Sequence, residues 1–165
     1  MAQDSNGSSQ RPSPAEVRGL GGWLLLPAAS MILSLGYFVL GLGSLRDLFL
    51  VLPRVDPGVG TFLVVEAVVA GLLQLVAPIY LLVLFFNTRI RFPRHYCYWL
   101  AAVLIYSIVD LNATWMLVQS YLAAPGEDPR LPDEIWQAPL RAAVAAAIWI
   151  PYMNHSVRVK NTFVN

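Results

Sequence analysis

Charge and cysteine are both scarce in this sequence. Only 13% of its 165 residues are Asp, Glu, Lys or Arg and 57% are apolar, whereas an ordinary soluble domain has roughly 25% charged residues. The net charge of +1 leaves no basic surface for nucleic acid once the loop charges are assigned. The single cysteine, Cys97, excludes an intramolecular disulfide and a cysteine-based metal cluster within one chain. Composition therefore indicates a protein whose partner is the lipid bilayer.

Motifs for catalysis and cofactor binding are also missing. The sequence has no glycine-rich phosphate loop, and no Ser or Cys nucleophile is paired with a base. His95 and His155 fall near the same predicted membrane face, but two histidines without a third ligand make a poor metal site. We therefore expect no cofactor, no metal and no enzymatic activity.

Four long apolar runs take up most of the chain, at residues 20–44, 61–86, 98–122 and 138–157. Each is close to or above the length of about 20 residues that spans the hydrocarbon core. The first run continues well beyond the small residues at 28–30, so it is too long for the apolar core of a cleaved signal peptide. The connections are short, which predicts that consecutive helices are antiparallel neighbours.

These runs predict an all-α fold, an integral membrane bundle of four transmembrane helices within residues 19–165. Residues 1–18 are rich in Ser, Pro, Gln and Gly and predict a disordered tail. Lys and Arg accumulate on the cytoplasmic side of membrane proteins. Here seven fall on one side of the bundle and three on the other (Arg11, Arg18, Arg89, Arg91, Arg94, Arg158 and Lys160 against Arg46, Arg54 and Arg130). Both termini are therefore predicted to be cytoplasmic.

Three ionisable side chains, Glu66, Asp110 and Arg141, fall inside the apolar runs. Such a group costs about 2.5–3.5 kcal/mol on insertion scales, so each needs a partner or a water-filled cavity. Helical spacing puts Glu66 and Gln74 on one stripe, and Asp110 and Arg141 on polar stripes of their own helices. If the stripes face one another, one guanidinium serves two carboxyls. The charge then balances when one carboxyl is protonated, when a cation or proton is bound, or when another subunit supplies a cationic group.

Three stretches of the chain carry a family resemblance: "GGWLLLPA" at 21–28, "LFFNTRIRFPRHY" at 84–96 and "IWIPYMNHSVRVKNTFV" at 148–164. They resemble the bacterial inner-membrane family catalogued as domain of unknown function 2569. The resemblance extends over about residues 19–164 and implies a four-helix protein of the bacterial inner (cytoplasmic) membrane. It also implies that Glu66 and Arg141 occupy family positions, while Asp110 has no counterpart in the family pattern. The motif residues are Gly22, Trp23, Pro27, Phe92, Pro93, Trp149, Pro151, Tyr152, Arg158 and Lys160.

The last of these stretches raises a question that topology does not answer. Pro151 is expected to kink the fourth helix, because it lacks the N–H that would bond to the preceding turn. Arg158 and Lys160 are expected to hold the helix end at the headgroups. The apolar residues at 162–164 follow these charges, and docking on the cytoplasmic face of the bundle or on a partner would explain them.

The sequence favours a non-catalytic accessory or assembly subunit of a larger membrane complex. Small residues repeat every four positions at Ala138, Ala142 and Ala146, a spacing that lets helices approach closely. The partner would be another membrane protein, or a second copy in a homo-oligomer. The alternative is a small oligomeric carrier or channel in which Glu66, Asp110 and Arg141 form a proton- or ion-linked site. A third interpretation is an ion pair that only locks the bundle.

Overall fold

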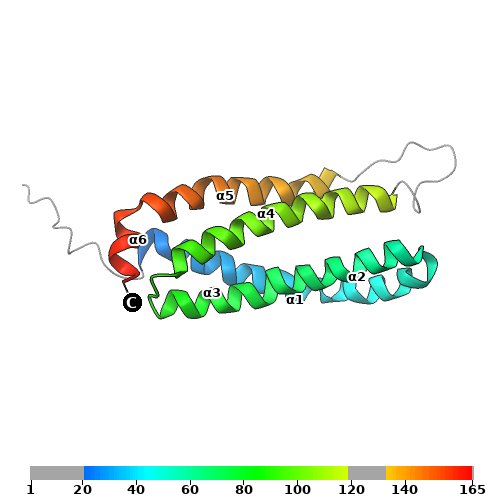
Figure 1. Cartoon of the computed structure of the whole chain (residues 1–165), viewed down its shortest axis with the longest axis horizontal. Helices are drawn as coiled ribbons and strands as arrows, with labels where there is room; N and C mark the ends of the chain where they lie inside the picture. Colours follow the sequence, from blue (N-terminus) through cyan, green and yellow to red (C-terminus); the bar gives the residue numbers. More distant parts are fainter. Residues whose placement is uncertain (1–20, 119–132, 165) are drawn as a thin grey trace, which may run out of the picture.

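Four long helical segments carry the fold (Figure 1), and the computed structural model describes residues 21–118 and 133–164 of the chain. The predicted tail at 1–18 and the end of the third predicted helix, after residue 118, lie outside the described residues. The elements in chain order are η2 (Gly22–Leu24), α1 (Leu25–Val51), η3 (Leu52–Arg54), α2 (Pro57–Gly71), η4 (Leu72–Val76), α3 (Ala77–Phe86), α4 (Phe92–Leu117), η6 (Asp133–Trp136), α5 (Gln137–His155) and α6 (Val157–Thr162). Of these, α2, η4 and α3 follow one another without a break and form a single rod.

Several helices extend beyond the apolar runs that predicted them. α4 begins at Phe92, six residues before the predicted start, because Pro93 occupies the first turn, where its missing N–H breaks no helical hydrogen bond. α2 likewise begins with Pro57, ahead of the predicted residue 61. α1 continues through Arg46 to Val51. These end turns contain polar residues, so hydropathy alone does not predict them as helical. The connections between the helices are therefore shorter than expected.

Three segments are long and apolar enough to cross a membrane: Gly22–Gly43, Pro57–Phe86 and Phe92–Met116, with mean hydropathies of 1.9, 2.4 and 1.4. α5 has 19 residues but is less apolar, and Arg141 lies in its second turn. Large apolar side chains are exposed along the helices, among them Leu40, Ile105 and Leu140. In water such exposure would be unfavourable, whereas lipid chains cover it at no cost.

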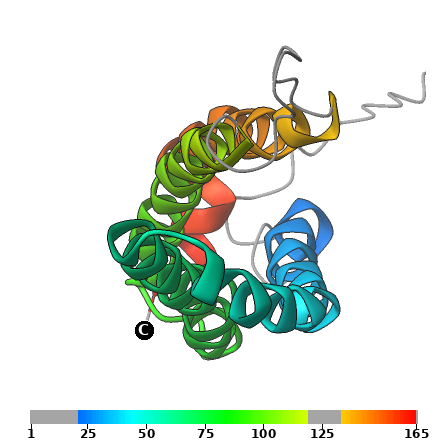
Figure 2. The ribbon, with the colours of Figure 1, turned by 90° about the vertical axis from the view of Figure 1, so that its right-hand side faces the viewer.

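The helices lie in an open arc when the molecule is viewed end on (Figure 2). Consecutive helices are packed as antiparallel neighbours, as predicted: α1 against the α2–α3 rod, the rod against α4, and α4 against α5. The pairing of α4 with α5 is the most extensive. α1 and α5 stand at the two ends of the arc, so its concave side opens between them (Figure 2).

A π-helical turn interrupts the rod at Leu72–Val76, just before Pro78. Proline has no backbone N–H and its ring clashes with the preceding turn, which is a common cause of such a turn. At the same place the indole Nε1 of Trp99 on α4 donates a hydrogen bond to the carbonyl oxygen of Leu73, at 2.8 Å. This bond satisfies a carbonyl of the interrupted turn and ties the middle of the rod to α4.

Four buried aromatic rings, Phe85, Phe92, Tyr96 and Phe163, hold one end of the bundle together, and we call them the aromatic base. Ring centroids are 4.7 Å apart for Phe92 and Phe163, 5.5 Å for Phe92 and Tyr96, and 5.2 Å for Phe85 and Phe92. The base joins α3, α4 and the C-terminal segment. Buried residues of η2, α1, α5 and α6 pack around it: Leu24, Ala28, Met31, Met153 and Val159.

The C-terminal segment reaches the base because the chain turns at Ser156. α5 ends at His155, two residues before the predicted end of the fourth helix, and Ser156 is extended with φ −66° and ψ 122°. α6 then folds back and buries Thr162 and Phe163. Thr162 and Phe163 therefore dock on the bundle itself, in line with the first of the two explanations that the sequence allowed.

Two of the family motifs also meet at this end. Gly22 has φ +58°, in the left-handed region that glycine adopts without strain. A Cβ at Gly22 would lie 3.0 Å from Nη1 of Arg158. The backbone conformation thus favours glycine here, and the guanidinium of Arg158 packs closely against it, so the start of α1 lies beside α6.

Replacing Phe163 by Ala tests the aromatic base. We expect Phe163→Ala to lower the free energy of unfolding by about 3 kcal/mol or more, because a stacked and buried ring leaves a cavity. Val164→Ala is the matched control: Val164 is 61% exposed, and its truncation should change stability by no more than about 0.5 kcal/mol. Equilibrium unfolding in mixed detergent micelles measures both. Equal effects of the two substitutions would contradict the packing described.

Candidate functional site

A cavity of about 340 Å³ lies between α1, α2 and α4 on the concave side of the arc. On the rod, Glu66, Ala70 and Gln74 follow one another every four residues and present one small and polar stripe to it. On α4, Tyr106 and Asp110 are likewise four residues apart. We call this space the carboxyl cavity. Its lining residues are Tyr37, Phe38, Gly41, Leu42, Leu63, Glu66, Ala67, Ala70, Gln74, Tyr106 and Asp110.

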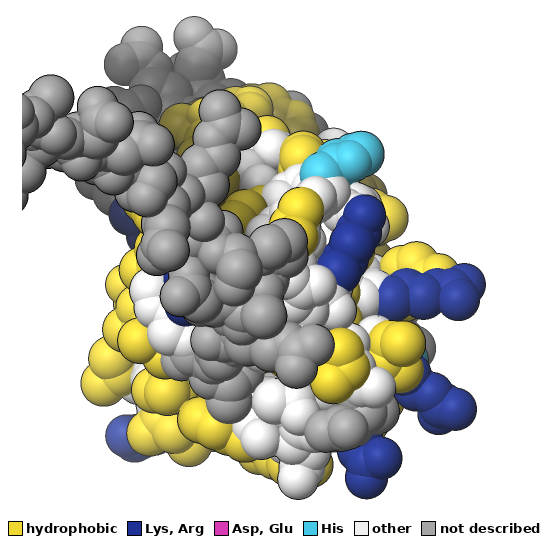
Figure 3. Space-filling model, turned by 90° about the vertical axis from the view of Figure 1, so that its left-hand side faces the viewer, with side chains coloured by type: hydrophobic (Ala, Val, Ile, Leu, Met, Phe, Trp, Pro, Cys, Tyr) yellow, Lys and Arg dark blue, Asp and Glu magenta, His cyan; other side chains and the backbone are white. Residues whose placement is uncertain are grey.

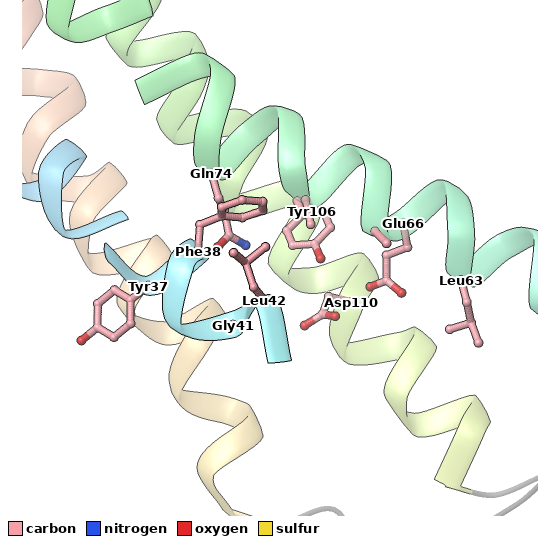
Figure 4. A pocket seen from close by; sticks show the side chains of 11 residues that line it. Tyr37, Phe38, Gly41, Leu42, Leu63, Glu66, Gln74, Tyr106 and Asp110 are labelled. Atoms are coloured by element: carbon pink, nitrogen blue, oxygen red, sulfur yellow. The ribbon is translucent and has the colours of Figure 1, made fainter. Parts of the chain in front are cut away.

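The carboxyl groups of Glu66 and Asp110 face each other across this cavity (Figure 4). The hydroxyl of Tyr106 points toward the same place. Oε1 of Glu66 is buried and has no hydrogen-bond partner among the described residues. Two like charges repel more strongly in a low-dielectric membrane than in water. The pair therefore calls for a proton, a cation or an outside cationic group between the carboxyls.

Asp110 meets Glu66 because α4 is longer at its start than the sequence indicated. With a helix over 98–122, Asp110 falls at mid-membrane, while Glu66 falls in the outer half. α4 instead begins at Phe92, and at about 1.5 Å per residue this moves Asp110 some 9 Å farther along its helix. Asp110 then lies at the level of the third turn of α2, where Glu66 stands.

Arg141 lies apart from this pair, in a second hollow that we call the α1–α5 groove. The groove has a volume of about 450 Å³ and is lined by α1 and α5 together with residues of η4 and α4. Nη2 of Arg141 donates a hydrogen bond to Oε1 of Gln137 on the same helix, at 2.6 Å. The lining residues are Ser30, Leu33, Ser34, Tyr37, Leu73, Gln74, Tyr96, Trp99, Leu100, Val103, Tyr106, Ala138, Arg141, Ala142, Ala145 and Trp149.

The structure thus brings together part of the polar cluster considered from the sequence. Glu66, Asp110 and Gln74 line one cavity, whereas Arg141 lies in the adjoining groove and contacts a neutral amide. The arrangement of one guanidinium between two carboxyls is not the one observed, because α4 stands between α5 and the rod in the arc. Tyr37, Gln74 and Tyr106 line both hollows and connect them.

Tyr106 is a site residue that the sequence analysis missed. Its position four residues before Asp110 is the signal that could have found it. Ser107 shares the predicted polar stripe of Asp110, but its Oγ donates to the carbonyl of Leu104 in its own helix, at 2.8 Å. A hydroxyl bonded in this way is satisfied locally, so the stripe alone does not identify which side chains face the cavity.

The family-motif residues divide between the aromatic base and the groove. Gly22, Pro27, Phe92 and Arg158 lie at the base, and Pro93 lies in the first turn of α4 beside it. Trp149 lines the groove and its ring packs edge-on against Tyr152, with centroids 5.5 Å apart. The side chains of Trp23, Pro151 and Lys160 are exposed. α5 continues through Pro151 to His155.

Fold and site together define an all-helical integral membrane protein with a carboxyl pair inside its membrane-spanning region. The family described as "Protein of unknown function (DUF2569)" matches residues 17–164, and the chain belongs to that family. The resemblance predicted from its motifs is confirmed.

A relative in Escherichia coli (strain K12), "Inner membrane protein YdgK", is 28% identical over 152 residues. The alignment covers 88% of this chain and 94% of the relative. No solved structure matches the chain.

Double-mutant cycles test which of the three ionisable residues interact. We expect the effects of Glu66→Gln and Asp110→Asn on the unfolding free energy to be non-additive, because the two carboxyls face each other. Glu66→Gln and Arg141→Gln should instead add to within about 0.5 kcal/mol, because they line different hollows. Unfolding in mixed micelles measures all variants. Coupling of Glu66 to Arg141 as strong as that to Asp110 would contradict the site described.

Proposed function

We propose that this protein is a non-catalytic accessory subunit that holds a transmembrane helix of a partner protein in the α1–α5 groove. The observation that carries the proposal is the open arc of the helices (Figure 2), together with the groove that α1 and α5 line. A closed four-helix bundle buries its small-residue faces internally, whereas here they line a hollow open to a neighbour.

The lining of the groove suits a helix better than a bulky ligand. One rim carries Ser30 and Ser34 on α1, and the other carries Ala138, Ala142 and Ala145 on α5. Small residues let helix backbones approach closely, which is how helices associate where lipid is as apolar as the interface. Trp149, also on α5, adds apolar surface to the lining.

Arg141 indicates what the partner helix carries. It is a cation at the groove wall, and in the described part of the chain its polar contact is the neutral side chain of Gln137. A guanidinium within a membrane-spanning region is stabilised by an anion. We therefore propose that the partner helix places an Asp or Glu side chain against Arg141.

The proposal includes four crossings, with both termini in the cytoplasm of the bacterial inner membrane. α5 runs alongside α4 over its length, which supports a crossing by α5 as well. Exposed Trp23 and Trp136 stand at opposite ends of the bundle, as aromatic residues do at the two interfaces. The relative's description as an inner membrane protein supports the same location.

Site-specific photo-crosslinking tests the groove directly. A photoreactive phenylalanine analogue at Ala142, inside the groove, should cross-link one membrane protein that also co-purifies at near-stoichiometric amount in gentle detergent. The same analogue at Val144, a 50% exposed position on the same helix, is the control and should not cross-link that protein. Cross-linking of Ala142 only to a second copy of this chain, or only to lipid, would overturn the proposal.

Filling the groove provides a second test. Ala142→Leu should lower the amount of co-purified partner about tenfold, equivalent to roughly 1.4 kcal/mol of binding free energy, because a larger side chain keeps the helices apart. Val144→Leu should leave the amount unchanged. If both substitutions keep wild-type levels of the partner, the groove is not the binding surface.

A second candidate function, a small proton- or ion-linked carrier, is favoured by the carboxyl cavity. Two carboxyls face each other inside a membrane-spanning region, and Oε1 of Glu66 has no hydrogen-bond partner among the described residues. Such a pair can accept and release a proton or a cation without a rearrangement of the backbone.

Flux measurements on reconstituted protein test this candidate. If it is correct, wild-type protein should carry protons or monovalent cations into vesicles under an applied potential. Glu66→Gln or Asp110→Asn should reduce the flux about tenfold or more, because each removes a titrating group of the site. Glu66→Asp keeps a carboxyl and serves as the control with retained flux. Wild-type vesicles that match empty vesicles would rule out the carrier.

A further inference from the structure

A separate hollow of about 430 Å³ lies at the hairpin between α3 and α4, outside both the carboxyl cavity and the α1–α5 groove. It is lined by Tyr80 and Leu84 from the last turns of α3, and by Arg89, Ile90 and Arg91 from the hairpin. Two guanidiniums thus stand over an apolar floor. We call this hollow the hairpin pocket.

Backbone hydrogen bonds fix the shape of the hairpin. Asn87 donates through Nδ2 to the carbonyl of Val83 at 2.7 Å, and Thr88 adopts a positive φ of 49°. The N–H of Arg89 then donates to Leu84 O at 3.0 Å, and that of Phe92 donates to Arg89 O at 2.9 Å. These bonds satisfy the end of α3 and the start of α4, so the side chains of Arg89 and Arg91 project from a defined turn.

The two arginines of the pocket differ from their neighbour Arg94. Nε of Arg94 donates to the hydroxyl of Tyr98 at 2.7 Å, and its guanidinium lies 5.5 Å from the centre of that ring. No Asp or Glu is among the residues that line the pocket, and none shows among the described side chains on this end of the molecule (Figure 3). Both guanidiniums are exposed and face the pocket, which leaves their donors for an external anion.

The position of the pocket selects the kind of anion. Tyr80 and Leu84 belong to the membrane-spanning segment that ends at Phe86, and the arginines follow directly after it. A ligand in the pocket therefore has apolar surface on its membrane side and two cations on its water side. Guanidiniums bind phosphate through paired N–H donors, and basic pockets at the end of transmembrane helices are typical sites for anionic lipid headgroups.

We propose that the hairpin pocket is a binding site for an anionic phospholipid, with the phosphate held between Arg89 and Arg91 and the start of the acyl chains against Tyr80 and Ile90. This site is independent of the partner proposed for the α1–α5 groove, and it does not require a particular orientation in the membrane. Unlike diffuse attraction to a basic surface, the binding of anionic phospholipid at this site depends on two particular arginines, Arg89 and Arg91.

Native mass spectrometry of the delipidated full-length protein, titrated with phosphatidylglycerol or phosphatidylcholine, tests the site. We expect wild-type protein to bind phosphatidylglycerol about tenfold more tightly, and the double variant Arg89→Gln/Arg91→Gln to lose this preference. Arg94→Gln/Lys160→Gln removes the same charge from the same end of the molecule and should keep it. Equal loss in both double variants would overturn the proposal in favour of diffuse attraction.

Two further arms keep the test decisive. Arg89→Lys/Arg91→Lys preserves charge and so protects the fold, but it replaces the forked donors, and we expect a smaller loss of preference than with glutamine. If the glutamine double variant does not fold, an unchanged preference for phosphatidylglycerol in the lysine double variant would contradict the proposed site. Inorganic phosphate and glycerol phosphate should not compete at lipid concentrations, and full competition would show that the pocket takes a soluble phosphate compound instead.

Discussion

The stacking of Phe163 on Phe92 is the contact on which the rest of the structure depends. It closes the C-terminal segment over α3 and α4, and the buried residues of α1, α5 and α6 gather around it. Helices in lipid gain nothing from the hydrophobic effect against one another, so a packed cluster at one end has a disproportionate effect on their arrangement. The α1–α5 groove begins at this cluster, where Tyr96 lines it, and the carboxyl cavity lies farther along the helices.

This division also explains the distribution of the family motifs. Gly22 and Arg158 are far apart in the sequence, yet the Arg158 guanidinium lies 3.0 Å from the position that a Cβ at Gly22 would take, so the two are in close contact. Phe92 and Phe163 are coupled in the same way. The motif residues therefore lie mainly where the base is assembled, and among them Trp149 lines the α1–α5 groove.

Much of the fold could be predicted from the sequence, because long apolar runs and short connections determine helices and their neighbours. The depth at which each polar residue lies in the membrane was harder to predict. The first turn of α4 contains a proline followed by Arg94 and His95, and it is helical in the structure. Because these residues are not apolar, the sequence analysis placed the start of the helix too late. That error moved Asp110 away from Glu66. The separation of Arg141 from both carboxyls follows from an arc instead of a closed bundle, and no single-helix pattern distinguishes the two.

The π-helical turn at Leu72–Val76 has a consequence for how the chain can change in length. A π turn amounts to one residue inserted into an α-helix, and each residue rotates the helix by about 100°. The half of the rod before the turn carries Glu66, and the half after it carries Phe85. Deleting one residue here would restore a regular helix and rotate one half against the other. The rod could then present its carboxyl to the cavity or its aromatic ring to the base, but not both.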